Sequence, residues 1–297
     1  MHVTHFTDPG CPWAYSAWPA HTTLRWRYGA QLRWTTVMIG LTEDAGQYAA
    51  RGYTPTRSAI GLGRYRRFGM PFQITPKARL SATSPACRAI VATRLAAPQL
   101  EDAALRALQF AQFTTTGTLD DPETLRSALA GVEGLEAEAV VERIDDPEVV
   151  AAYETDRARA RSAAGSPTEF QGRAANTDGA VRYTAPSLIF ERSDGERLEA
   201  GGFQPLEAYD VVIANLDPTL ERRPPADEPV EVLNAFPYPL TTAEVAALMT
   251  EHLGVPDLAA AEAALIAATG EGHVNRQPAG DGSLWAPRRR SAAPSRE

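Results

Sequence analysis

The first forty residues show a strand pattern, a helix pattern and a second strand pattern. Residues 2–8 alternate between polar and apolar positions and are rich in β-forming side chains, and a Pro-Gly pair ends them. A helical pattern runs from about Pro12 to Tyr28, and residues 32–41 give a second strand pattern that ends in a continuous apolar run. A helix between two strands is a crossover connection, so we expect the strands to be parallel.

A long helical block follows an irregular stretch. Residues 42–80 show no clear period and contain many Gly, Pro and Arg, so we interpret them as a partly ordered excursion over the surface. Asp121 and Asp146 each precede a proline, which is the arrangement of an acidic N-cap before Pro at the first helical position. From Ser84 onwards the period is helical, and we expect helices at residues 85–97, 100–115, 121–130, 135–144 and 147–164.

Strand patterns return in the last third of the chain. Residues 181–191 and 197–200 are separated by an Asp-Gly turn and predict a hairpin, which a helix at residues 205–216 follows. The order strand, helix, strand, helical block, hairpin and helix predicts an α/β protein with an interrupted thioredoxin fold. We assign the thioredoxin-fold domain to residues 1–80 and 178–220, and an all-helical insertion to residues 81–177.

The C-terminal quarter predicts a separate small module. Residues 221–229 are rich in proline and have the composition of a linker. Thr241 then opens a helix with a capping box, and a second helix and a hairpin pattern follow. This order predicts a winged-helix-like module at residues 230–287. We expect the polar residues 288–297 to be disordered.

Composition and charge exclude several classes of function. With 297 residues, 44% of them hydrophobic and 22% charged, the chain has the composition of a water-soluble globular protein. Its formal net charge of −8 disfavours binding to nucleic acid or to an anionic membrane. The sequence shows neither a signal peptide nor an apolar run long enough to span a bilayer, so we expect a cytoplasmic protein.

The charge of the C-terminal module argues in the same direction. Between Val230 and Ala286 there are seven acidic residues, one Arg and no Lys. A surface that reads DNA needs clustered positive charge, and this module has the opposite. We therefore expect the module to serve in packing or in dimerisation, which leaves a homodimer open.

Cysteine is scarce in this chain. Only Cys11 and Cys87 occur, which is too few for the disulfide scaffold of a secreted protein. Neither they nor the five histidines form a spaced metal-ligand motif, so we expect no metal site. In a reducing compartment the two thiols are either inert core residues or reactive groups.

Cys11 stands where a strand pattern ends and a helix pattern begins, with Pro12 at the first helical position. The amides and the dipole of a helix N-terminus favour an anion, so we expect the thiolate of Cys11 to be stabilised. Pro19 lies inside the same helix pattern and is expected to kink the helix.

A proline at the entry of a later strand supplies a second feature. Thr184, Ala185 and Pro186 stand directly before the apolar run at residues 187–190. Proline at this place in a central strand is unusual, and a cis X–Pro bond is one way to accommodate it. A cis-proline loop that faces Cys11 leaves the backbone of Ala185 free to pair with an extended or thiol-containing ligand.

Three segments together resemble the DsbA-like thioredoxin family, and within it the cytoplasmic FrnE-type proteins and the 2-hydroxychromene-2-carboxylate isomerases. The resemblance extends over about residues 2–216, with the helical insertion included. It implies that Cys11 is a nucleophilic thiol and that Pro186 is the cis-proline beside it, and we place Pro12 in the same catalytic site. The three segments read DPGCPWAYS at residues 8–16, YTAPS at residues 183–187 and AGGFQPLEAY at residues 200–209.

The chain departs from the family pattern at one position. Oxidoreductases of this family usually carry Cys-Pro-x-Cys, whereas here Ala14 stands in place of the second cysteine. Cys11 therefore cannot close a disulfide within its own motif, and three alternatives stay open. In the first, Cys11 exchanges as a monothiol with a low-molecular-weight thiol or disulfide, or with a protein thiol. In the second, Cys87 serves as a resolving thiol, because in related proteins its helix packs over the active site.

The third alternative has no redox chemistry. Kappa-class glutathione transferases and 2-hydroxychromene-2-carboxylate isomerases share the architecture and lack the second cysteine, although they typically carry Ser at the nucleophile position. A relative that only binds a small molecule or a partner belongs to the same alternative. We expect no tightly bound cofactor other than a low-molecular-weight thiol, either glutathione or mycothiol. The abundance of Ala, Arg and Gly is typical of a high-GC bacterial genome, which favours mycothiol.

Residues around Cys11 and an arginine-rich segment are candidates for substrate binding. Trp13 and Tyr15 predict an apolar rim beside the thiol, and Thr184 and Ala185 of the proline loop adjoin it. Arg67 belongs to a segment whose guanidinium groups can hold the carboxylates of a thiol cofactor or an acidic substrate. The other arginines of that segment are Arg51, Arg57, Arg64 and Arg66. The sequence thus predicts DsbA-like oxidoreductase chemistry, or other thiol-dependent chemistry, through a single cysteine.

Overall fold

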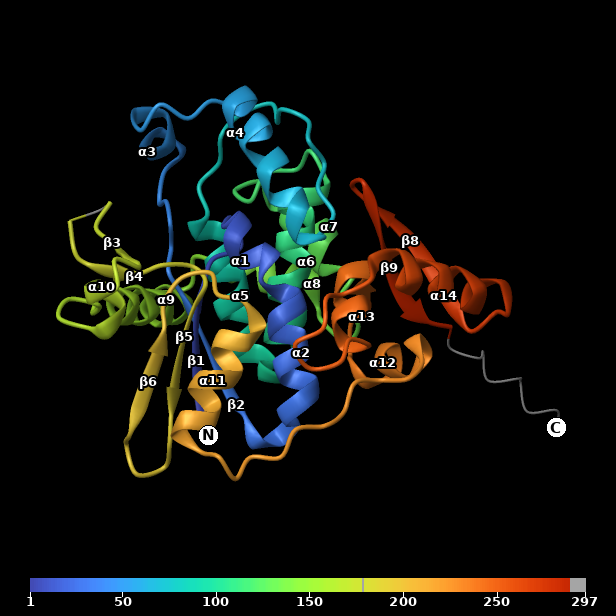
Figure 1. The fold of residues 1–297 in the computed structure, drawn as a ribbon. Coiled ribbons are helices and arrows are strands. Elements are labelled where there is room, and N and C mark those ends of the chain that lie inside the picture. Colours follow the sequence, from blue (N-terminus) through green and yellow to red (C-terminus); the bar gives the residue numbers. More distant parts are fainter. Residues whose placement is uncertain (178, 289–297) are drawn as a thin grey trace, which may run out of the picture.

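The computed structural model describes residues 1–177 and 179–288. Its central sheet has four strands in the order β2-β1-β5-β6 (Figure 1). The strands β1 and β2 are parallel, with Thr4 opposite Thr35, and this confirms the crossover that the sequence predicts. The other two strands form an antiparallel hairpin beside β1. The bounds are His2–Thr7 for β1, Arg33–Met38 for β2, Ser187–Glu191 for β5 and Arg197–Ala200 for β6.

The helix expected at residues 12–28 is two helices, α1 (Pro12–Ser16) and α2 (Trp18–Tyr28), with a break at Ala17. Pro19 accounts for the break, because inside a continuous helix its ring would clash with the carbonyl four residues before it. In the structure Pro19 lies in the first turn of α2, where a missing N–H costs nothing. The kink that the sequence predicts is therefore a full interruption. A short 3₁₀ turn, η1 (Gly29–Gln31), ends α2.

Residues 42–80 are more ordered than the sequence indicates. They contain three short helical elements, α3 (Ala45–Ala50), α4 (Pro55–Leu62) and the 3₁₀ helix η2 (Gly63–Phe68). Asp44 caps α3 by accepting a hydrogen bond from the amide of Gly46, and Thr54 caps α4 in the same way. Each element is at most eight residues long, which is too short for a helical period to stand out in the sequence.

The helical insertion forms the largest hydrophobic cluster with the face of α1 and α2 that carries Tyr15 and Trp18. Asp121 caps its helix by accepting from the amide of Thr124 at 3.1 Å, whereas the side chain of Asp146 makes no capping hydrogen bond. The five expected helices are present as α5 (Ser84–Ala96), α6 (Glu101–Thr114), α7 (Pro122–Leu129), α8 (Ala137–Glu142) and α9 (Pro147–Ala160), with the short η3 (Pro98–Leu100) and α10 (Pro167–Phe170) in addition.

The strand expected at residues 181–191 is divided in two. Its first part, β4 (Arg182–Tyr183), leaves the central sheet and pairs with β3 (Ala174–Ala175), while the second part is β5. The division falls at Pro186, which has no amide to donate to a neighbouring strand. After β6, α11 (Leu206–Leu216) packs with α2 against one face of the sheet.

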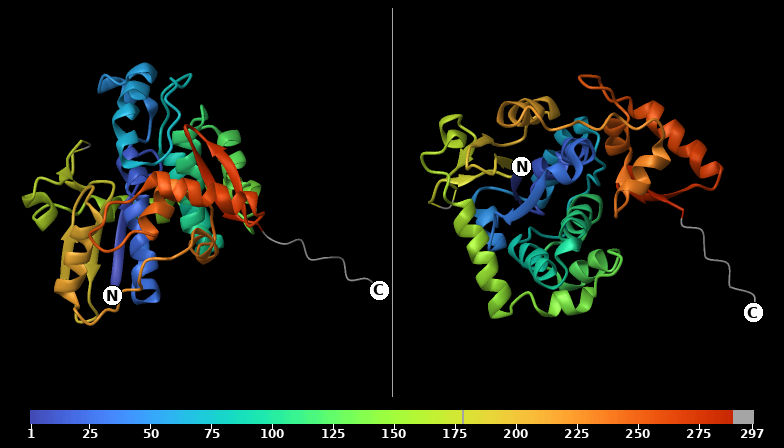
Figure 2. Two further views of the ribbon diagram at one scale, coloured as in Figure 1. Left: turned by 45° about the vertical axis from the view of Figure 1, so that its right-hand side comes forward. Right: turned by 90° about the horizontal axis from the view of Figure 1, so that it is seen from below.

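Residues 229–287, which we call the C-terminal module, follow a stretch without helix or strand at residues 221–228. The short α12 and β7 are absent from the sequence prediction, and β7 extends the predicted hairpin to a sheet of order β7-β9-β8. Figure 2 shows the module beside α2, on the side away from β6. Among the described helices, none is long and apolar enough to cross a membrane. The module comprises α12 (Pro229–Ala235), β7 (Leu240–Thr241), α13 (Thr242–Leu248), α14 (Leu258–Gly270), β8 (Val274–Ala279) and β9 (Gly282–Pro287).

A buried ion pair joins the C-terminal module to the rest of the chain. Glu244 of α13 is fully buried and forms two hydrogen bonds with Arg106 of α6, at 2.6 and 2.9 Å. The hydroxyl of Thr22 on α2 donates to the same carboxylate at 2.8 Å. Burial by itself would raise the pKa of Glu244, but the guanidinium of Arg106 outweighs it and lowers that pKa. Three elements from different parts of the chain therefore meet at one carboxylate.

Candidate active site

Cys11 lies in the turn between β1 and α1, at the edge of the central sheet. Its thiol donates a hydrogen bond to the carbonyl oxygen of Ala185, with 3.1 Å between sulfur and oxygen. The peptide bond between Ala185 and Pro186 is cis. Phe6 near the end of β1 pairs with Ser187 at the start of β5, and this antiparallel register brings the two loops to the same edge of the sheet. The topology thus places the thiol beside the proline loop.

The Cys11 thiol is protonated in this arrangement. Only 7% of the residue is exposed, and burial raises the pKa of the thiol to about 12. The amides of Ala14 and Trp13 at the start of α1 lower the pKa, as expected of a helix N-terminus, but they do not outweigh the loss of solvent. The carboxylate of Asp8 raises it further. The expectation of a stabilised thiolate is therefore wrong for the site in this structure.

Asp8 is a buried carboxylate that the sequence reasoning did not single out. It accepts hydrogen bonds from the amides of Gly10 and Leu41, both at 2.8 Å, and from the hydroxyl of Thr83 at 3.1 Å. The thiol of Cys87 lies 3.5 Å from the same carboxylate. Burial raises the pKa of Asp8. An acidic residue directly after an apolar strand was the available signal, but Asp before Pro-Gly is also typical of a turn.

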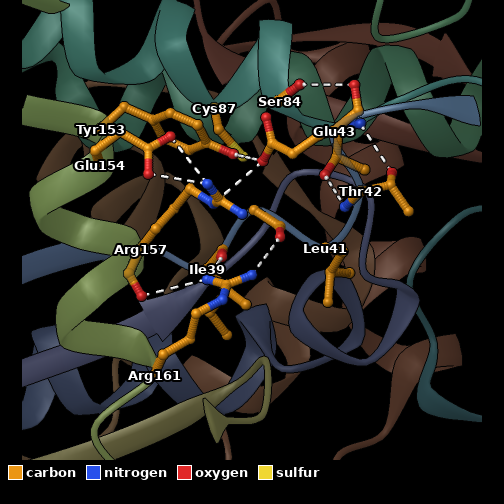
Figure 3. A network of polar contacts seen from close by, with 12 residues as sticks. Ile39, Leu41, Thr42, Glu43, Ser84, Cys87, Tyr153, Glu154, Arg157 and Arg161 are labelled. Carbon is orange, nitrogen blue, oxygen red and sulfur yellow. Dashed lines mark hydrogen bonds and ion pairs between the residues drawn. The ribbon is translucent and has the colours of Figure 1, made fainter. Parts of the chain in front are cut away.

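Cys87 is fully buried in α5 and faces Asp8 rather than the proline loop. Burial and the nearby Asp8 raise the pKa of its thiol well above the usual value. Figure 3 shows the polar network on its other side, in which the hydroxyl of Tyr153 donates to Glu43 at 2.6 Å and Arg157 pairs with Glu43 at 3.2 Å. The two thiols have different hydrogen-bond partners, and a resolving role for Cys87 stays a prediction.

Four aromatic side chains, which we call the aromatic cover, gather next to Cys11. The ring of Trp13 lies 4.9 Å from that of Tyr65, 5.7 Å from that of Phe68 and 5.3 Å from that of Phe203. The rings of Phe68 and Phe203 are 4.6 Å apart. Trp13 also packs on the hydrophobic cluster that contains Cys11. The cover therefore combines α1, η2 and the segment after β6, which are far apart in the sequence.

A cleft of about 920 Å³, which we call the basic cleft, adjoins this cover. Gly10, Pro12, Trp13 and Tyr65 line one part of it. Among the described residues that line it none is acidic, although the whole chain carries a net charge of −8. Such a cleft attracts anions. Six lining residues carry a basic side chain, namely Arg51, Arg57, Arg64, Lys77, Arg79 and Arg182.

Lys77 differs from the other cations of the cleft. It is the only lysine of the chain. Its ammonium group donates to the side-chain oxygen of Gln112 at 3.0 Å and to the carbonyl of Gly117, which are both neutral acceptors. Burial lowers the pKa of Lys77 to about 8. The cleft therefore contains one cation that titrates near neutral pH.

The model of the DsbA-like thioredoxin domain matches residues 2–185, which is more than half of the chain. The chain belongs to the DsbA-like thioredoxin family. No curated protein sequence matches it.

Solved structures with the same fold accompany the family match. A probable DsbA oxidoreductase from Streptomyces coelicolor is 18% identical with a TM-score of 0.55, over 76% of this chain and 93% of that one. A candidate protein disulfide isomerase from Nitrosomonas europaea is 18% identical with a TM-score of 0.55, over 72% and 96%. A cytosolic disulfide reductase of Pseudomonas aeruginosa, solved with glutathione, is 16% identical with a TM-score of 0.50, over 74% and 99%.

The structure of this DsbA-like protein brings most of the predicted site residues together. Cys11, Pro186 and Ala185 lie in one place, although the Ala185 carbonyl is occupied by the thiol rather than free. Thr184 lies in the same loop, where its hydroxyl donates to the carbonyl of Arg173 at 2.7 Å. Trp13 borders both the thiol and the basic cleft.

Two of the predicted substrate-binding residues are placed differently from expectation. Tyr15 is fully buried, and its hydroxyl donates to the carbonyl of Pro71 at 2.9 Å, because it lies on the face of α1 that packs against the insertion. Arg67 is exposed, lies 4.8 Å above the ring of Phe68 and is not among the described residues that line the cleft. Arg64, in the same 3₁₀ helix, lines the cleft instead.

Proposed function

We propose that this DsbA-like protein performs thiol–disulfide exchange through Cys11 alone, with an anionic low-molecular-weight disulfide held in the basic cleft. The observation that carries the proposal is that the Cys11 thiol lies next to the basic cleft. The thiol of Cys11 lies 3.1 Å from the proline loop, and its neighbours Gly10, Pro12 and Trp13 line a cleft with six basic side chains. Arg79 pairs with Asp120 at 2.7 Å, but the exposed Arg51, Arg57 and Arg64 of this cleft are suited to the carboxylates of a small thiol.

The exposed arginines of the cleft support an anionic ligand. Arg51, Arg57 and Arg64 are exposed and make no ion pair with any described residue. Arg57 instead donates to the carbonyl of Gly52 at 2.8 Å. Guanidinium groups that are not paired within the protein can form bidentate hydrogen bonds with carboxylates. The relative solved with glutathione is a disulfide reductase of the same fold, and glutathione carries two carboxylates.

The exchange proceeds in two balanced steps. The Cys11 thiol loses its proton to solvent, and the thiolate attacks one sulfur of the bound disulfide, which forms a mixed disulfide and releases one small thiol. A second small thiol then attacks the mixed disulfide, so that Cys11 returns to its thiol form and a small disulfide leaves. Over the two steps, one small thiol replaces one half of the disulfide, so that one small thiol and one disulfide stand on each side of the reaction and no other oxidant or reductant is needed. Cys87 takes no part.

The protonated state of Cys11 sets the expected rate. A pKa of about 12 instead of about 9 leaves roughly a thousandfold less thiolate at neutral pH. A mixed disulfide carries no charge on sulfur, so burial does not oppose the product as it opposes the thiolate. We therefore expect slow formation of a stable mixed disulfide, which becomes faster as the pH rises.

Intact-protein mass spectrometry after incubation with 3,3′-dithiodipropionic acid, a dianionic disulfide, tests the proposal. The wild type and Cys87→Ser are expected to gain one half-disulfide adduct, and Cys11→Ser none. Loss of two hydrogens without an adduct in the wild type would instead place Cys87 as the resolving thiol. An adduct on Cys87, or none on Cys11 at any pH up to 10, contradicts the proposal.

One observation favours a second candidate, which is thiol-dependent transfer or isomerisation of an anionic substrate. Ala14 occupies the place of the second cysteine of the motif and is buried, with 2% exposure. The motif therefore contains no second thiol with which Cys11 could form a disulfide. Binding of a dianion to the cleft together with an unreactive Cys11 would favour this candidate over exchange.

A further inference from the structure

The turn between β8 and β9 of the C-terminal module reaches back to the segment that follows η2. The amide of Phe72 donates to the carboxylate of Asp281 at 2.7 Å, and the amide of Asp281 donates to the carbonyl of Phe72 at 3.1 Å. The second carboxylate oxygen of Asp281 pairs with Arg66 in η2 at 2.6 Å. One side chain in the turn thus contacts both η2 and the segment after it.

The turn packs closely against this segment. Gly280 has a φ of +54°, and a Cβ there would lie 2.7 Å from the backbone carbon of Phe72. A Cβ on Gly282 would lie 3.0 Å from Pro71. On the other side, a Cβ on Gly69 would lie 2.9 Å from the Cβ of Ala243 in α13. The module therefore packs closely around residues 63–73, which we call the cover segment.

The cover segment contacts α1, the helix that begins next to Cys11. It carries Tyr65 and Phe68, which are two of the four rings of the aromatic cover and lie against Trp13. Its Pro71 carbonyl accepts the hydroxyl of Tyr15 from α1, the helix that begins next to Cys11. A displacement of this segment therefore changes what lies over the thiol and the wall of the basic cleft that Tyr65 forms.

We propose that Asp281 is a positioning residue for Cys11, and that the C-terminal module serves to hold the aromatic cover closed over the thiol. The proposal deepens the proposed function, on which it rests, because it names what limits access to the same site. It also gives the module a role within the chain. The module lies outside the matched family domain at residues 2–185, so this contact is a feature that the domain alone does not supply.

Closure and reactivity are linked through burial. The low exposure of Cys11 is what keeps its thiol protonated. Removal of the Asp281 carboxylate breaks a hydrogen bond to a backbone amide and an ion pair with Arg66, and it leaves the rest of the module in place. Loss of one charged hydrogen bond is enough to make an open state about ten times more populated. In the open state water reaches the thiol, and its ionisation becomes easier.

The test compares Asp281→Ala with the wild type in the rate at which iodoacetamide, a neutral reagent, alkylates Cys11 between pH 7 and pH 10. We expect a rate about ten times higher in the variant, with the whole pH profile displaced to lower pH. Hydrogen exchange read by mass spectrometry is expected to become faster in the cover segment. Asp281→Asn, which keeps an oxygen acceptor for the Phe72 amide but loses the charge, is expected to fall between the two.

Asp257→Ala is the matched control. Asp257 caps α14 of the same module by accepting from the amide of Ala260 at 2.9 Å, and no hydrogen bond or ion pair between it and the cover segment occurs among the described residues. This variant weakens the module without touching the contact, so Cys11 alkylation is expected to stay within twofold of the wild type. An equal increase in both variants, or no increase in either Asp281 variant with the fold intact, overturns the proposal.

The outcome separates this inference from the proposed function. Alkylation by iodoacetamide requires only that the thiol be reached, and it does not depend on disulfide exchange. If Cys11 forms no mixed disulfide in any variant but Asp281→Ala is alkylated faster, the exchange function is wrong and the positioning role of Asp281 stands. If mixed disulfides form at the same rate in all variants, the function stands and the positioning role is wrong.

Discussion

Arginine has opposite roles in the basic cleft and in the buried ion pair between Arg106 and Glu244, which we call the joint. In the joint, Arg106 is nearly inaccessible, and both of its terminal nitrogens bond to a carboxylate of the same chain. In the cleft, Arg57 and Arg64 are exposed and have no acidic partner among the described residues. An internally paired arginine contributes to the fold, whereas an unpaired one in a concave surface is available to a ligand.

The contrast separates residues that hold the site from residues that use it. Glu244 belongs to the C-terminal module and attaches it to α2 and α6. In this position of the module, its β8–β9 turn contacts the cover segment. Changes at the joint should therefore act on stability first. Changes in the cleft should act on ligand affinity and leave stability almost unchanged.

The largest effect is expected for Glu244→Ala, which leaves Arg106 buried without its partner. We expect a loss of about 3–5 kcal/mol in the free energy of unfolding, measured by urea denaturation. Because Arg106 lowers the pKa of Glu244, the stabilisation is present above the unfolded-state pKa of the carboxyl group and is lost as the pH falls through the lowered value.

The control for this variant is Glu231→Ala. Glu231 of the C-terminal module forms an ion pair at 2.7 Å with Arg223 in the stretch before the module, and both side chains are exposed. Its loss is expected to cost about 0–1 kcal/mol. Equal losses in the two variants would show that the buried joint has no special role in stability.

A smaller effect is expected on ligand binding for the double variant Arg57→Ala/Arg64→Ala. Its dissociation constant for 3,3′-dithiodipropionic acid, measured by calorimetry in the Cys11→Ser background, is expected to be about ten times higher, because two unpaired cations of the cleft are lost. Binding of neutral 2-hydroxyethyl disulfide should not change. Arg126→Ala/Arg143→Ala removes the same charge from arginines that have acidic partners outside the cleft, and should leave both affinities alone.

The smallest effect is a pH dependence that depends on Lys77. Burial lowers the pKa of Lys77 to about 8, so the cleft loses one positive charge as the pH rises from 7 to 9. Affinity for the dianion in the Cys11→Ser background should therefore fall a few-fold over this range. In Lys77→Gln the affinity should be lower at pH 7 and nearly independent of pH. A fall of the same size in Lys77→Gln would assign the titration to another group.

Much of the scaffold follows from local patterns in the sequence. The β1–β2 crossover, the five insertion helices and the β8–β9 hairpin all have the periods and turn residues that predict them. The errors fall where tertiary contacts decide the local structure. Pro19 interrupts a helix that its neighbours would continue, and Pro186 divides one strand pattern between two sheets.

The site is only partly readable from the sequence. Cys11 and Pro186 are marked by motifs, and the antiparallel register of β1 and β5 brings them together. No local motif predicts the burial of the thiol, because Phe68 and Phe203 pack on Trp13 from distant segments and Asp8 resembles a turn residue. A helix N-terminus therefore predicts a thiolate where the folded chain holds a thiol.

The most direct test of the central claim, that Cys11 is the reacting group although it is protonated at rest, is the pH dependence of its modification by 3,3′-dithiodipropionic acid. A pKa of about 12 predicts an adduct on Cys11 alone, with a rate at saturating reagent that rises close to tenfold per pH unit from pH 7 to pH 10 and shows no plateau. A plateau near pH 7 would contradict the protonated thiol, and modification of Cys87 in place of Cys11 would contradict the site itself.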